Sequence, residues 1–105
     1  MIPLAQISTL GLTSPDTVDM RVLAANVAER HTVPAGATTV LIQGAGDFYV
    51  RWHATLDASI PAGDVTDGSG AEYKPDLRGL LNLTSFSIIA PATNVVSLSF
   101  FAKPA

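Results

Sequence analysis

The chain has few side chains that could bind a metal ion, and the types present restrict the possible metal sites further. His31 and His53 are the only two histidines among the 105 residues, and there is no cysteine. A zinc site would therefore need both histidines together with carboxylates that are distant in the sequence. We expect no metal site at the histidines, and we expect His53, close to Arg51, to lie on a solvated or interfacial face.

Three acidic residues fall in a glycine-rich stretch and could offer oxygen ligands to Ca²⁺: Asp64, Asp67 and Glu72. Their spacing differs from that of a calcium-binding helix–loop–helix, which has ligands at alternating loop positions and a closing glutamate. The pair Asp67–Gly68 is typical of a turn, because aspartate forms local hydrogen bonds and tolerates positive φ. The stretch therefore indicates turn chemistry, and we expect no metal and no cofactor.

Two glycine-containing motifs resemble catalytic or nucleotide-binding turns only in part. Gly44–Ala45–Gly46 follows a strand-like run, but Tyr49 stands where a dinucleotide-binding turn needs its third glycine, and an aromatic strand replaces the required helix. Ser69 lies between two glycines, but Asp67 stands where a nucleophile elbow needs glycine. Neither motif predicts a catalytic residue, so we expect no enzyme.

Aromatic and cationic residues alternate along 48–54, a predicted strand. The alternation assigns Val50, Trp52 and Ala54 to the core and Tyr49, Arg51 and His53 to the opposite face. A platform on which carbohydrate stacks could be formed by Tyr49, Arg51, Trp52, His53 and Tyr73, but the assignment of Trp52 to the core argues against it. Tyrosine and arginine are enriched at protein contacts, so Tyr49, Arg51 and Tyr73 are our candidate interface residues, and glycan binding is the alternative.

The elements that position these residues are short strand-like runs separated by Gly and Pro turn signals. We predict strands at 38–43, 48–54, 85–90 and 94–102, and a brief strand or turn at 77–83. Alternation places Val40 with Ile42, and Val96 with Leu98 and Phe100, on shared faces. Residues 55–76 are predicted to be an ordered surface excursion held by Ile60, Val65 and Tyr73.

Residues 14–30 allow two interpretations. Ser14, Pro15 and Asp16 form a helix-start signal, after which Val18 and Val22 could share a helical face. A strand that ends near Leu23, a turn at 24–26 and a second strand through Val33 fit equally well. We favour the strands, because Pro34 follows closely and residues 26 and 27 are middling helix formers.

Residues 1–19 are predicted to be an extended arm. The segment mixes Gly, Ser, Thr and Pro with large aliphatic residues, which are Ile2, Leu4, Ile7, Leu10 and Leu12. A frayed terminus is the alternative. A frayed terminus is normally polar, so we favour an arm that orders on a neighbouring subunit, and these five residues are also candidate interface residues.

Composition favours a single domain with a protein partner. The net charge of −3 argues against nucleic acid as the main partner. No apolar run is long enough to span a membrane, and the first residues lack the basic region of a signal peptide. Only 14% of the residues are charged while 48% are hydrophobic, whereas small soluble domains usually have about a quarter or more charged surface residues. We therefore expect an apolar protein–protein interface and a homo-oligomer, with a trimer as the expected state.

Several segments resemble small proteins encoded in the structural gene clusters of tailed phages. The resemblance covers residues 22–102 and is carried by 33–38, 48–51, 65–69, 87–92 and 96–101. It implies a virion component of the capsid decoration or head-associated type, made in the host cytoplasm and bound to the major capsid protein on the capsid surface. It implies no catalytic residues, and it does not extend over the first 21 residues.

These observations predict an all-β protein: a single antiparallel β-sandwich, jelly-roll-like, over residues 20–105, with an extended N-terminal arm over 1–19. The expected function is structural, as a decoration protein that stabilises a capsid through subunit contacts. A glycan-binding β-sandwich module and a tail or neck connector are the alternatives.

Overall fold

The computed structural model describes residues 14–102, which form eight strands and no helix. The strands are β1 (Thr17–Leu23), β2 (Glu29–Thr32), β3 (Ala37–Gly44), β4 (Tyr49–Arg51), β5 (Glu72–Tyr73), β6 (Leu77–Gly79), β7 (Ser85–Ile89) and β8 (Asn94–Ala102). The candidate arm residues Ile2, Leu4, Ile7, Leu10 and Leu12 lie outside the described residues. Because β1 begins at Thr17, residues 17–19 belong to a strand and not to the predicted arm.

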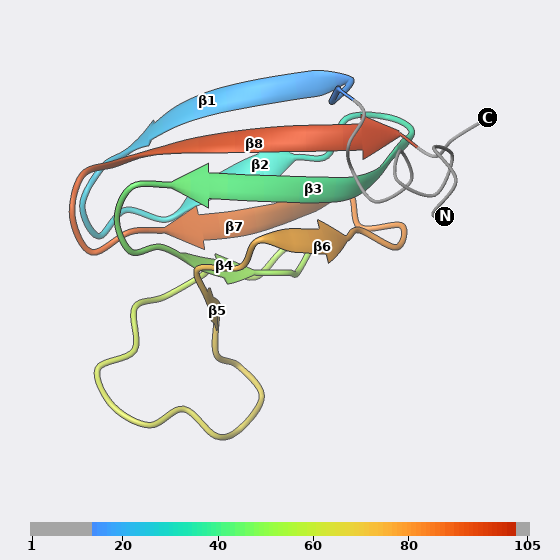
Figure 1. The fold of residues 1–105 in the computed structure, drawn as a ribbon. Coiled ribbons are helices and arrows are strands. Elements are labelled where there is room, and N and C mark those ends of the chain that lie inside the picture. The colour runs from blue at the N-terminus through green and yellow to red at the C-terminus, as the bar shows by residue number, and fades with distance from the viewer. Residues whose placement is uncertain (1–13, 103–105) are drawn as a thin grey trace, which may run out of the picture.

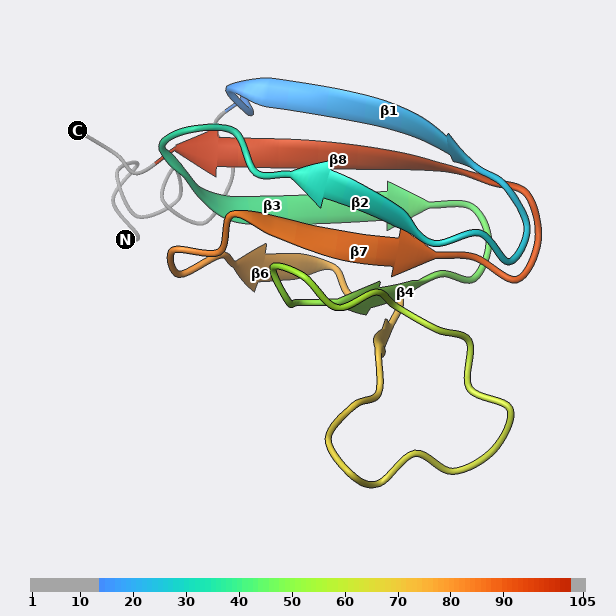
Figure 2. The ribbon, with the colours of Figure 1, turned by 180° about the vertical axis from the view of Figure 1, so that it is seen from behind.

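The strands form two antiparallel sheets of four strands each (Figures 1 and 2). Sheet 1 has the order β1-β8-β3-β6, and sheet 2 has the order β2-β7-β4-β5. Every pairing between neighbouring strands in these two orders is antiparallel. The prediction of an all-β antiparallel protein is therefore confirmed for the described part of the chain.

One hydrophobic core contains side chains from both sheets. Its buried members are Leu23, Val40, Ile42, Phe48, Val50, Leu80, Phe86, Ile88, Ala90, Val96, Leu98 and Phe100. The rings of Phe86 on β7 and Phe100 on β8 lie 6.4 Å apart between centroids and so link the two sheets. The predicted alternation is confirmed in β3 and β8, where Val40, Ile42 and the three predicted β8 residues are all buried.

Residues 17–32 form two strands, so the helical interpretation is wrong and the strand interpretation is confirmed. β1 pairs with β8 along its whole length, a non-local interaction that outweighs the local helix-start signal. Asn26 takes a left-handed conformation with φ 62° and donates its amide to Ala90 O at 2.7 Å. This turn carries the chain from sheet 1 to sheet 2.

The strand predicted at 48–54 is much shorter, because the chain turns directly after Arg51. His53 N donates to Arg51 O at 2.9 Å, and the ring Nδ1 of His53 accepts the amide of Leu56 at 3.1 Å. Ala54 is therefore exposed and not in the core as predicted, and Trp52 is only half-buried.

The connection from β4 to β5, residues 52–71, projects from the two sheets as an open loop (Figures 1 and 2). The predicted anchors Val65 and Tyr73 are exposed, so the prediction was wrong for both, whereas Ile60 is half-buried. Ala58 holds the loop instead: its side chain is buried and its amide donates to Ser87 Oγ at 2.9 Å.

The first part of this loop is also held by one arginine on sheet 2. The Arg30 guanidinium donates to the carbonyls of His53, Ala54 and Leu56 at 2.8–2.9 Å. It also forms an ion pair with Asp57 at 2.9 Å. Polar contacts with β2 therefore replace the apolar anchors that the sequence predicted.

Candidate interaction surface

Two of the three acidic residues considered for calcium, Asp67 and Glu72, are engaged in hydrogen bonds, and the third, Asp64, is exposed. Asp67 Oδ1 accepts both the amide and the hydroxyl of Ser69, at 3.0 and 2.6 Å, and these bonds hold the pKa of Asp67 below its usual value. Glu72 accepts from Arg78 Nε at 3.0 Å, and this contact lowers the pKa of the Glu72 carboxyl. Among residues 14–102, no three His, Asp or Glu side chains gather as metal ligands would.

The two histidines have opposite environments. His53 is exposed in the loop after β4. His31 points into the core from β2 with 1% of its surface exposed, and neither ring nitrogen has a hydrogen-bond partner in the part of the chain that the structure describes. Burial, and to a smaller degree the charge of Arg21, lowers the pKa of His31 to about 4, so its imidazole is neutral at pH 7.

Of the predicted interface residues, Tyr49 and Tyr73 come together, at the edge of sheet 2. They are paired across β4 and β5, with ring centroids 5.3 Å apart and ring planes inclined by 51°. Tyr73 donates its hydroxyl to Asp47 Oδ1 at 2.7 Å, which raises the pKa of Tyr73. Arg51 follows on the same strand and is half-buried.

Trp52 does not join these tyrosines in a flat platform. Its ring packs on the core residue Phe86, with centroids 5.0 Å apart, and its Nε1 donates to Glu72 Oε1 at 2.8 Å. The stacking surface expected for a glycan therefore lacks its largest ring, and the two tyrosines that remain are tilted against each other.

The sequence did not predict one exposed apolar surface, which is the outer face of sheet 1. We call it the apolar face, and its strand residues are Val18, Met20 and Val22 of β1, Val95, Ser97, Ser99 and Phe101 of β8, Thr39, Leu41 and Gln43 of β3, and Leu77 of β6. Directly paired residues point to the same side of a sheet, so the register places all of them together. None of them is ionisable.

Several side chains of the apolar face are widely exposed to solvent. Met20 and Val22 are 63% and 65% exposed, and Val18, Val95 and Leu77 are 43–48% exposed. Three strands taken as seven residues long and the three-residue strand β6, about 4.8 Å apart and at about 3.3 Å per residue, outline roughly 400 Å². Uncharged apolar patches of this size on a single chain are often functional.

β1 is inverted relative to the usual pattern of a surface strand. Its apolar residues point to solvent, whereas Asp19 and Arg21 point to the side of Leu23 and the core. The alternation was visible in the sequence, but by itself it would assign Val18, Met20 and Val22 to the core. The buried Leu23 and the pairing with β8 fix the opposite orientation, so the strand presents its apolar side to solvent.

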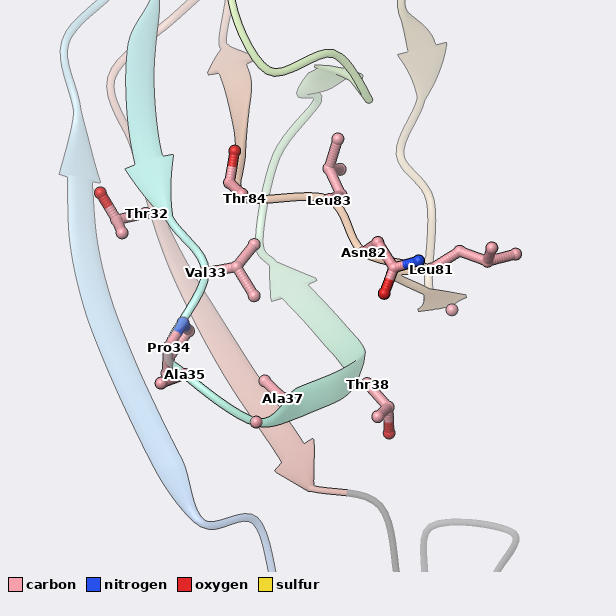
Figure 3. A pocket seen from close by; sticks show the side chains of 12 residues that line it. Thr32, Val33, Pro34, Ala35, Ala37, Thr38, Leu81, Asn82, Leu83 and Thr84 are labelled. Carbon is pink, nitrogen blue, oxygen red and sulfur yellow. The ribbon is translucent and has the colours of Figure 1, made fainter.

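A groove of about 780 Å³ opens between the loops 32–38 and 79–84 (Figure 3). Its apolar wall includes Val33, Pro34 and Leu83, and Leu81 at its rim is 89% exposed. No lining residue is ionisable, so the groove offers no group for acid–base chemistry. It fits the description of a contact surface better than that of an active site.

No helix capable of spanning a bilayer occurs among residues 14–102. Comparison of the chain with protein families, with curated proteins and with solved structures finds no match.

Proposed function

We propose that this protein is a structural assembly protein whose apolar face binds a protein surface, and that the surface is the exterior of a phage capsid. The observation that carries the proposal is the exposed, uncharged outer face of sheet 1, centred on Met20 and Val22. The sequence resemblance supplies the capsid as the partner, and in that role the chain is a homo-oligomeric decoration protein located on the virion.

The strand order supports a jelly roll as the fold. In a jelly roll, eight strands form two sheets, each with four strands, by means of two Greek keys, and this architecture is common in viral proteins. The orders β1-β8-β3-β6 and β2-β7-β4-β5 fit that connectivity, with β1 beside β8 in one sheet and β2 beside β7 in the other. The same architecture also carries unrelated functions, so the argument for assembly rests on the surface.

The free energy available from the apolar face favours attachment through several copies. Half-exposed Val, Leu and Met side chains gain about 1 kcal/mol each on full burial, which gives about 5 kcal/mol for the five most exposed residues. The association of two proteins costs about 4–15 kcal/mol in lost translational and rotational freedom. One face therefore binds weakly, and an oligomer that presents several faces to a shell gains avidity.

The proposal is tested by co-sedimentation of the protein with purified capsid shells, using a matched pair of charge-introducing variants. Val18→Lys introduces a charge on the apolar face, and Val65→Lys introduces the same charge in the 52–71 loop. The two valines are 48% and 45% exposed, so the substitutions are equivalent except in location. We expect Val18→Lys to reduce co-sedimentation at least tenfold and Val65→Lys to leave it unchanged.

Equal binding by both variants, or no binding of the unmodified protein to shells, would contradict the proposed function. Binding to purified tails in place of shells would assign the protein to the tail or neck and overturn the capsid location.

A further inference from the structure

The free edge of β1 is the longest unpaired strand edge of the described residues. β1 ends sheet 1 and has seven residues, whereas the other terminal strands β6, β2 and β5 have three, four and two. An edge strand presents backbone amides and carbonyls that can pair with a strand from another chain. Next to this edge lies the most exposed part of the apolar face, formed by Val18, Met20 and Val22.

The apolar face is too small to form a stable interface alone. A stable complex usually buries about 800 Å² on each partner, and the face outlines roughly half of that from its strand spacings. A further element is therefore needed to complete the contact, and the free edge of β1 shows where it can be added.

The chain outside residues 14–102 has the length and composition of such an element. Residues 1–13 contain no Asp, Glu, Lys, Arg or His, and five of the thirteen are Ile or Leu. In extended form, thirteen residues reach up to about 43 Å, while the seven residues of β1 span about 23 Å, at about 3.3 Å per residue. The segment is thus long enough to follow the whole edge, and its lack of charge matches the apolar face.

The backbone at Asp16 continues the pairing of β1 with β8, on the side opposite to the free edge of β1. Asp16 N donates to Phe100 O at 2.9 Å, and Asp16 Oδ2 accepts the amide of Ala102 at 2.6 Å, so the chain is held toward the end of β8. A tight hairpin at Ser14–Pro15 that returned the same chain along the free edge of β1 is disfavoured. The favoured two-residue hairpins need positive φ at their first central residue, or Gly there, whereas a residue before proline is restricted to extended conformations.

We propose that residues 2–12 of a second copy of this chain add as a strand to the free edge of β1, beside Val18, Met20 and Val22, and so widen the apolar face that binds the capsid. This inference rests on the proposed assembly function and specifies the contact between copies. Backbone hydrogen bonds to the edge provide the pairing, and the aliphatic residues of the segment pack beside the exposed side chains of β1 and extend the apolar face of sheet 1. Each copy gives one segment and receives one, which links the copies into a closed oligomer.

The chain has no cysteine, so the proposal can be tested by disulfide trapping, and native thiols cannot form competing disulfides. One sample carries Ile7→Cys on a chain with a large tag, and the other carries Met20→Cys on an untagged chain. After mixing and mild oxidation, we expect a mixed disulfide that joins a tagged chain to an untagged one. The matched control replaces Met20→Cys with Val65→Cys, and we expect at least tenfold less mixed product.

A second measurement uses deletion of residues 2–13, which leaves β1 and its pairing with β8 intact. We expect the truncated chain to be a folded monomer by light scattering and circular dichroism, while the full chain is an oligomer. A truncated chain that is still oligomeric, or that no longer folds, overturns the proposal. A disulfide formed within a single chain that carries both Ile7→Cys and Met20→Cys overturns it as well.

These outcomes are independent of capsid binding. If trapping fails but Val18→Lys still abolishes co-sedimentation with shells, the segment exchange is wrong and the proposed function stands. If trapping succeeds but shells are not bound, the exchange stands and the capsid assignment is wrong.

Discussion

His31 makes the stability of this protein sensitive to mild acid. The side chain is buried opposite Phe86, with ring centroids 5.9 Å apart, and both ring nitrogens are without partners. Burial lowers its pKa from 6.5 to about 4, with a further lowering by Arg21 and a smaller opposing effect of Asp19. The folded protein therefore resists protonation that the unfolded chain accepts.

The sign and size of the effect follow from linkage. Above pH 6.5 the imidazole is neutral in both states, and the free energy of unfolding is unaffected. As the pH falls from 6.5 to about 4, the unfolded chain binds a proton that the folded protein does not bind, so folding is progressively weakened. A pKa difference from 6.5 to about 4 corresponds to about 3 kcal/mol in total. That is a large part of the roughly 5–15 kcal/mol stability of a small domain.

Urea unfolding at several pH values between 7.5 and 4.5 measures this effect. The original protein should lose stability by up to about 1.4 kcal/mol per pH unit below pH 6.5. His31→Phe should remove that slope and cost little at pH 7.5, because an apolar ring replaces two unpaired polar nitrogens. The control His53→Gln should retain the slope. The carboxyls of Asp67 and Glu72, whose pKa values are lowered, lose their contributions only below this range.

A slope that persists in His31→Phe would refute the reasoning, since the proton would then be bound elsewhere. A flat profile in the original protein would refute it as well.

Three further predictions concern the core and the acidic loop. Trp52→Ala should lower the free energy of unfolding by about 2 kcal/mol, less than the 3–5 kcal/mol typical of a fully buried ring, because Trp52 is half-buried; urea titration measures this, and an unchanged midpoint would contradict the packing on Phe86. Gly44→Ala should cost about 1–3 kcal/mol, since a Cβ there would meet Val96 Cγ1 at 2.9 Å, while Gly63→Ala, which meets nothing within 4 Å, should cost little. EDTA should leave the melting temperature unchanged, and a decrease reversed by Ca²⁺ would indicate a site at Asp64, Asp67 and Glu72.

The sequence alone was sufficient to predict the strands in which one face is clearly more apolar than the other. In β3 and β8, apolar residues such as Val40, Ile42 and Leu98 alternate with a set that contains threonine, glutamine and serine, and all three are buried. Period-2 alternation is a local property that any pleated strand imposes, so these elements could be assigned without knowledge of their partners. The strand at 85–90 and the turn at 24–26 were predictable for similarly local reasons.

The extent of β4 and the anchoring of the loop that follows depended on distant residues. The predicted strand ended early because Arg30 and Ser87 bind backbone groups of residues 53–58. Such contacts join residues separated by 23–29 positions, and no local pattern encodes them.

The orientation of β1 shows most clearly what only the tertiary structure decided. Alternation in residues 17–23 established that Val18, Met20 and Val22 share one side of a strand, but it could not say which side faces the core. The pairing with β8 and the burial of Leu23 turned the apolar side outward. A strand face is buried or exposed according to what the rest of the chain packs against it, so only the fold could show that exposed apolar side chains gather on the outer face of sheet 1.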